Sequence, residues 1–99
     1  MKKGYWVVTF RKVKDEKRLQ DYREIAGPAL KEYGAKALVR GIPAVVHELG
    51  MAEQVVILEF PSLDQAIRAH DSREYQDALK VLGDAVERDI RIIDGIEQP

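Results

Sequence analysis

The chain has 99 residues, of which 45% are apolar and 33% charged, and its formal net charge at pH 7 is -1. These values are typical of one soluble globular domain over residues 1–99, and they argue against a nucleic-acid partner, which requires a concentrated basic face. The sequence contains no cysteine, which excludes disulfides and thiolate metal sites. No apolar run approaches the roughly 18 residues that span a bilayer, and no signal-peptide pattern opens the chain, so we expect a cytoplasmic protein without a membrane partner.

The first two predicted elements are a strand and a helix. Residues 5–13 are rich in aromatic and β-branched side chains, which is typical of a strand. Asp15 can cap the helix that follows, whose apolar residues recur at spacings of three and four: Leu19, Tyr22, Ala26, Leu30 and Tyr33. Pro28 cannot donate a helical hydrogen bond, so we expect it to kink or split this helix, and we expect Gly34 to end it in a left-handed conformation.

The middle of the chain reads as extended structure. Residues 35–50 predict two short extended pieces with a bend at residues 41–43, which include a glycine and a proline. A turn follows, and residues 54–60 then predict a strand. We therefore expect up to three extended segments between the two helical regions.

The second helical region opens at Ser62, which stands three residues before Gln65 in the spacing of a capping box. Further helix-start signals near Asp71 and Ser72 predict that this helix breaks and restarts there. Residues 88–96 predict the last strand.

The order of elements, β-α-β-β-α-β, predicts an α+β fold of the ferredoxin-like type. Right-handed crossovers place both helices on one face of a four-stranded antiparallel sheet. Two strands nevertheless carry apolar residues on both faces, at residues 55–58 and 90–93. A large bare apolar face is unusual on a monomer, so we expect a two-fold homodimer in which two sheets pack together.

Several short motifs resemble the domain-of-unknown-function 1330 family. They are GYW at residues 4–6, GPAL at 27–30, VRG at 39–41, ILEFPS at 57–62 and SREYQ at 72–76. The resemblance implies membership of the dimeric α/β-barrel superfamily, which includes small monooxygenases and muconolactone-isomerase-like proteins. It implies a ferredoxin-like protomer but not a reaction, because this fold hosts many functions. The chain departs from the expected pattern at His70 and Asp71, before SREYQ.

Glu59 and Arg40 are the charged candidates for a site. Glu59 ends an apolar strand, where a carboxylate in a cleft could act as a base. It could equally pair with an arginine, Arg40 among them, or accept hydrogen bonds from amides at the start of the next helix. Arg40 could bind a substrate carboxylate through its planar guanidinium or serve as the partner of Glu59.

His70 is the second candidate base, although neighbouring helical residues such as His70 and Asp71 do not face each other, so a dyad has weak support. Trp6, Tyr22 and Tyr75 could line a ligand pocket between sheet and helices, but their spacing also fits plain core packing. We find no motif for a metal site or for a phosphate-binding loop, and we expect no cofactor.

Three functions remain open at this point. The first is a dimeric barrel protein that binds a small apolar or carboxylated molecule between helices and sheet. The second is a cofactor-free enzyme, an isomerase or monooxygenase acting on a small organic acid or aromatic compound, with Glu59 or His70 as base and Arg40 orienting the substrate. The third is a structural or interaction module whose only output is its dimer.

Overall fold

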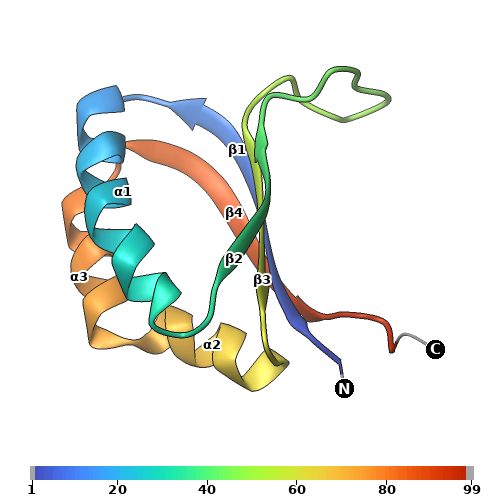
Figure 1. Cartoon of the computed structure of the whole chain (residues 1–99). Coiled ribbons are helices and arrows are strands. Elements are labelled where there is room, and N and C mark those ends of the chain that lie inside the picture. The colour runs from blue at the N-terminus through green and yellow to red at the C-terminus, as the bar shows by residue number, and fades with distance from the viewer. Residues whose placement is uncertain (1, 98–99) are drawn as a thin grey trace.

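The computed structural model describes residues 2–97, which form one sheet and three helices (Figure 1). In chain order they are β1 (Gly4–Val13), α1 (Glu16–Lys31), β2 (Lys36–Gly41), β3 (Val55–Phe60), α2 (Leu63–Asp71), α3 (Arg73–Leu82) and β4 (Val86–Asp94). None of these helices is long and apolar enough to cross a membrane. The order matches the predicted one, with the second helical region divided in two.

The four strands are antiparallel and lie in the order β2-β3-β1-β4, and all three helices cover one face of the sheet (Figure 1). This is the ferredoxin-like arrangement. Along β1 the side chains alternate between buried and half-buried, because successive residues of a strand point to opposite faces. Trp6, Val8 and Phe10 point toward the helices, and they form the centre of the core.

Side-chain caps begin all three helices. Asp15 accepts a hydrogen bond from the amide of Arg18, and Ser62 accepts one from the amide of Gln65. The hydroxyl of Ser72 accepts from the amide of Tyr75 and donates to the carbonyl of Ala69, so this one residue ends α2 and begins α3. The predicted break near Ser72 is therefore confirmed.

Pro28 does not split α1, which continues to Lys31. The predicted split is therefore wrong, whereas the alternative, a kink, stays a prediction. Pro28 and Glu24 both lie on the exposed side of α1. The Glu24 carbonyl that loses its helical donor can bond to water there. An unbroken α1 carries one row of side chains along the whole length of the sheet.

Residues 44–50 do not form the second extended piece that the sequence predicts. After β2 ends at Gly41, residues 42–54 form a long connection that extends beyond the sheet (Figure 1). A strand requires a neighbour to satisfy its backbone hydrogen-bonding groups, and residues 44–50 pair with none of the four described strands. We call residues 42–54 the β2–β3 arm.

The sheet surface opposite the helices is termed the open face. Its side chains follow from the strand register and are Tyr5, Val7, Thr9 and Arg11 of β1, Lys36 and Val39 of β2, Val55, Ile57 and Glu59 of β3, and Asp89, Arg91 and Ile93 of β4. Val39 and Ile93 are 44% and 56% exposed. The apolar residues at the middle of this surface have no cover within the described chain.

Gly34 connects α1 to β2 with a φ of +85°, in the left-handed region that glycine favours. A Cβ there would also stand 2.8 Å from two atoms of the Pro61 ring. We expect Gly34→Ala to lower the free energy of unfolding by about 1–3 kcal/mol. Urea unfolding followed by circular dichroism measures this change. Gly27→Ala is the matched control, because it adds a methyl group to α1 with no atom within 4 Å and should stabilise the helix slightly. Equal effects of the two substitutions would contradict the prediction.

Candidate pocket between helix α1 and the sheet

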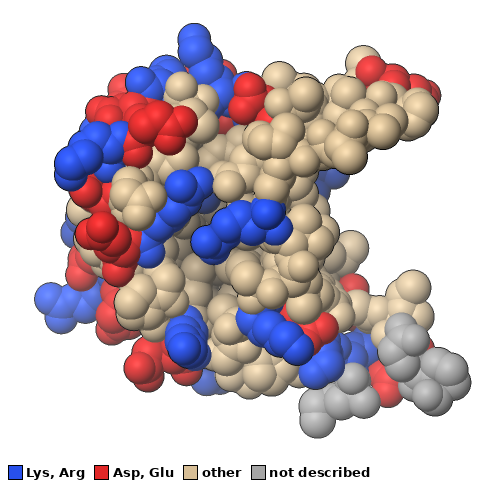
Figure 2. Space-filling model, turned by 45° about the horizontal axis from the view of Figure 1, so that its top comes forward, with Lys and Arg blue, Asp and Glu red and all other residues tan. Residues whose placement is uncertain are grey.

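A pocket of about 260 Å³ lies between α1 and the helix-facing side of the sheet. It exists because α1 packs chiefly against α3 rather than directly on the strands. Figure 2 shows basic side chains around the hollow between the helical layer and the sheet. The apolar part of its wall comes from the core, including Trp6, Val8, Ala26, Leu30 and Leu58.

Arg40 reaches this pocket because β2 contains an irregularity at Leu38. Ala37 pairs with Leu58 and Arg40 pairs with Val56, so two residues three positions apart lie on the same face of the sheet. Regular alternation would have placed them on opposite faces. A bulge that turns one side chain toward the other face is a frequent feature near functional sites. Arg40 is exposed and lines the pocket; its binding of a substrate carboxylate stays a prediction.

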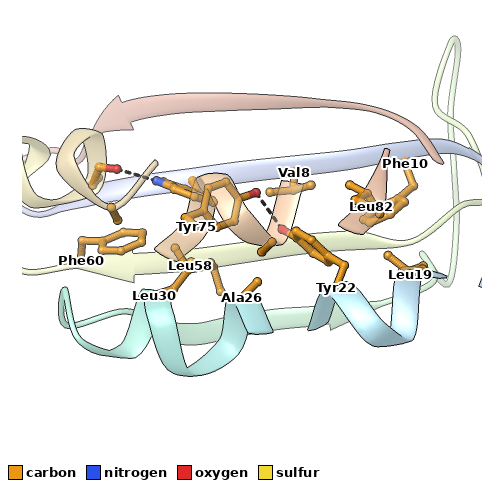
Figure 3. Close-up of a cluster of buried hydrophobic side chains, with 14 of the residues drawn as sticks. Val8, Phe10, Leu19, Tyr22, Ala26, Leu30, Leu58, Phe60, Tyr75 and Leu82 are labelled. Atoms are coloured by element: carbon orange, nitrogen blue, oxygen red, sulfur yellow. Dashed lines mark hydrogen bonds between the residues drawn. The ribbon is translucent and has the colours of Figure 1, made fainter. Parts of the chain in front are cut away.

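Arg88 lies against a pair of tyrosines at the floor of the pocket. The hydroxyl oxygens of Tyr22 and Tyr75 are 2.7 Å apart, and Arg88 Nη2 donates to each of them at 3.2 Å. The guanidinium also stacks over the Tyr22 ring at 4.9 Å. Figure 3 shows the two tyrosines pointing toward one another from α1 and α3. Tyr22 lines the pocket, whereas Tyr75 is fully buried behind it.

Burial raises the pKa of Tyr75 above its ordinary value. A tyrosine hydroxyl is already protonated at neutral pH, and the raised pKa keeps that of Tyr75 protonated to a higher pH. The sequence analysis weighed Tyr75 as a wall residue against Tyr75 as a core residue, and the structure places it in the core, one hydrogen bond away from the pocket wall.

Arg23 and Gln54 complete the polar end of the pocket. Arg23 Nη2 donates to Gln54 Oε1 at 2.7 Å. The backbone carbonyl of Gln54 accepts a hydrogen bond from the amide of Phe10, which fixes the start of β3 beside β1. Both side chains are half-buried and line the pocket.

Trp6 belongs both to the core and to the lining of the pocket. Its side chain is 1% exposed, its Nε1–H donates to the carbonyl of Ala66 at 2.8 Å, and its ring contacts Phe60 and Tyr75. The part of the indole that these contacts leave uncovered lines the pocket.

Glu59 lies on the open face, away from the pocket. Its Oε2 accepts a hydrogen bond from the Tyr5 hydroxyl at 2.9 Å, and Lys3 Nζ is 3.9 Å from its Oε1. This hydrogen bond is the main cause of the raised pKa of Tyr5. The expectation that Glu59 shares a site with Arg40 is wrong, because β3 directs alternate residues to opposite faces and Arg40 points to the helix side.

His70 is on α2, outside the pocket lining. Its ring packs near Trp6 and Tyr75, with centroids 5.8 and 5.3 Å away, and its Nδ1 is 3.4 Å from Asp71 Oδ1. That distance is long for a hydrogen bond, and both side chains are accessible to solvent. Among residues 2–97, no three histidine or carboxylate side chains converge as they would on a metal ion.

A family model for a domain of unknown function, DUF1330, matches residues 3–96. The chain belongs to the DUF1330 family. No curated protein matches it. The family assignment agrees with the resemblance of the sequence motifs, and it leaves the activity of this DUF1330 protein open.

Solved structures share the fold of this DUF1330 protein at low sequence identity. RPA0582, a protein of unknown function from Rhodopseudomonas palustris, is 16% identical with a TM-score of 0.72, over 97% of this chain and 84% of that one. A putative antibiotic biosynthesis monooxygenase from Caulobacter crescentus is 14% identical with a TM-score of 0.57, over 97% and 91% of the two chains. A dimeric ferredoxin-like protein of unknown function from Thermobifida fusca is 15% identical with a TM-score of 0.52, over 93% and 90%.

Among the polar residues of the DUF1330 pocket, sequence reasoning missed Arg23, Lys31, Gln54 and Arg88. A signal for Arg88 was present, because it lies two and four residues before Ile90 and Ile92, which share its face of β4. A charge in phase with buried apolar residues indicates a special environment. Arg23 follows Tyr22 on an amphipathic helix, and one sequence gives no signal that separates it from an ordinary surface arginine.

Proposed function

We propose that this DUF1330 protein is a homodimer in which each protomer binds a small organic molecule in the pocket beneath α1. The cytoplasmic location expected from the sequence is kept as part of this proposal. The observation that supports this proposal is the pocket, whose volume is about 260 Å³. Core side chains form its walls, and four basic side chains surround it. Its volume is close to the lower end, about 300 Å³, of typical small-molecule sites, so the ligand is small.

Binding is favoured over catalysis by the groups that the pocket presents. A cofactor-free isomerase or monooxygenase needs a proton acceptor beside its substrate. Glu59 faces the opposite side of the sheet, and His70 lies outside the lining. Tyr75 is held protonated by its burial. The monooxygenase description of the Caulobacter relative therefore remains a secondary reading for this chain.

The homodimer is supported by the open face and the β2–β3 arm. Val7 and Ile57 are paired at the middle of the open face, with Val39 beside Ile57 on β2 and Arg91 beside Val7 on β4. Ile93 lies in the next row of this face, opposite Tyr5. The arm carries further exposed apolar side chains, and its Leu49 is 96% exposed. A second copy would cover both features at once, and the related Thermobifida protein is described as dimeric. A two-fold pairing of identical sheets is also the simplest closed assembly.

Trp6 gives a direct test of ligand binding, because it is the only tryptophan of the chain and it lines the pocket. We expect hexanoate or hexanamide, neither of which absorbs where tryptophan does, to change its fluorescence in a saturable way. Ala37→Phe should abolish the response by filling the pocket from β2. Leu38→Phe adds the same ring at the neighbouring residue, outside the lining, and should retain the response. No response to either compound, or one that survives Ala37→Phe, would reject the proposal and favour the interaction module.

A further inference from the structure

The pocket is strongly basic on a chain whose net charge is -1. Its lining includes Arg23, Lys31, Arg40 and Arg88, and no aspartate or glutamate among the residues that the structure describes. Outside the pocket, four arginines have carboxylate partners: Arg11, Arg18, Arg68 and Arg91. The described ion pairs include none for the three pocket arginines. A half-buried guanidinium without a counter-ion is costly, and a bound anion would supply one.

The tyrosine pair determines which hydrogens face the pocket. Two hydroxyls share one contact of 2.7 Å, so only one of them donates in it. Tyr75 is fully buried, and the described contacts give its hydroxyl hydrogen no acceptor other than Tyr22. Tyr75 therefore donates to Tyr22, and the hydrogen of Tyr22 remains free at the pocket wall. Arg88 also donates to both oxygens, so neither hydroxyl is left as a ready acceptor for a ligand.

Gln54, like Tyr22, is oriented so that it offers hydrogen-bond donors. Its Oε1 is occupied by Arg23 Nη2, which leaves the two hydrogens of its amide nitrogen for other partners. The polar end of the pocket thus presents hydrogen-bond donors from tyrosine, glutamine and arginine. A ligand that fits this end must present acceptors, preferably with negative charge.

The sheet register separates the polar end from an apolar end. Arg88 lies opposite Phe10, whose backbone amide donates to the carbonyl of Gln54. Arg40 lies in the adjacent row, with Val56 and Val8. The next row holds Ala37, Leu58 and Trp6, and the lining continues with Leu30 and Ala35. Rows on one face are two residues apart, which is about 7 Å along the strands. The hydrocarbon wall therefore begins one to two rows from the donors.

We infer that the ligand is a small organic carboxylate, with its acid group at Arg88, Tyr22 and Arg40 and its hydrocarbon part between Leu58 and Leu30. This inference rests on the proposed function and names the chemical class of its ligand. A carboxylate matches the planar guanidinium and accepts several hydrogen bonds at once. The apolar wall then excludes water from the rest of the molecule.

Hexanoate and hexanamide test the inference, because they differ in charge and hardly in shape. We expect Trp6 fluorescence to give at least a tenfold tighter dissociation constant for hexanoate. Arg88→Met should weaken hexanoate binding by roughly 10- to 100-fold and leave hexanamide within a few-fold. Arg68→Gln removes an exposed arginine on α2 and should retain the wild-type preference. Below about pH 4, where a carboxyl becomes protonated, the affinity for hexanoate should fall to that for hexanamide.

Arg40→Gln provides a second variant should Arg88→Met fail to fold, because Arg40 is exposed on the edge strand. It should also reduce the preference for hexanoate. Equal affinities of the wild-type protein for the two compounds, or a preference that survives both substitutions, would overturn the carboxylate inference while leaving small-molecule binding intact. Absence of any fluorescence response would instead reject the proposed function itself.

Discussion

Ile57→Lys is expected to convert the dimer into folded monomers. Ile57 lies at the middle of the open face, between Val7 and Val39 on the neighbouring strands. In a two-fold pairing of sheets, the new ammonium group would be buried in both copies without a partner. The penalty for such a charge is several kcal/mol, which corresponds to roughly a thousandfold weaker association. Sedimentation or light scattering at micromolar concentration measures the change.

The protomer should survive this substitution, because Ile57 points away from the core. Its far-ultraviolet circular dichroism should therefore match that of the wild-type protein. Ile67→Lys is the matched control: Ile67 is 44% exposed on α2, on the helical side of the molecule, and its substitution should leave the dimer intact. A wild-type monomer, or a dimer that tolerates Ile57→Lys, would show that the open face is not the interface.

The faces of β1 could be predicted from the sequence because alternation alone fixes them. The same rule applies to β3, but its apolar residues lie on both faces. The sequence therefore did not show which face of the sheet Glu59 occupies. The position of Arg40 was not predictable, since it depends on the irregularity at Leu38. One extra residue in a strand reverses the face of everything beyond it, and no residue type at 36–41 marks that point. The sequence therefore grouped Arg40 with Glu59, which the folded sheet separates.

The β2–β3 arm illustrates a second limit. Val45 and Val46 favour a strand by composition, yet strand propensity reflects packing against neighbours more than an intrinsic backbone preference. In the described protomer they pair with none of the four strands. Their exposure, 70% and 41%, is a property of the single chain, and a partner that covers the open face would change it. The composition of residues 44–50 thus indicated an extended segment that the described protomer does not form.

Trp6→Ala is expected to remove about 3–5 kcal/mol of stability, a large part of the 5–15 kcal/mol typical of a folded domain. The indole fills the centre of the core, and its deletion would leave a cavity beside Phe60 and Tyr75. Denaturant unfolding at one fixed protein concentration measures the loss, since the proposed dimerisation would also contribute to stability.

Trp6→Phe separates packing from hydrogen bonding at the same position. Phenylalanine keeps most of the apolar contact but loses the indole N–H that donates to the Ala66 carbonyl. The expected cost is about 1–2 kcal/mol, the sum of one hydrogen bond and a small loss of volume. Were Trp6 chiefly a platform for the ligand, both substitutions would weaken hexanoate binding while changing stability little. The contacts of the indole predict the opposite result, a larger effect on stability than on binding. Most of the indole surface packs in the core, and only the remaining edge is available to a ligand. Because its apolar wall belongs to the core, the specificity of the pocket is expected to reside in the polar side chains at its other end.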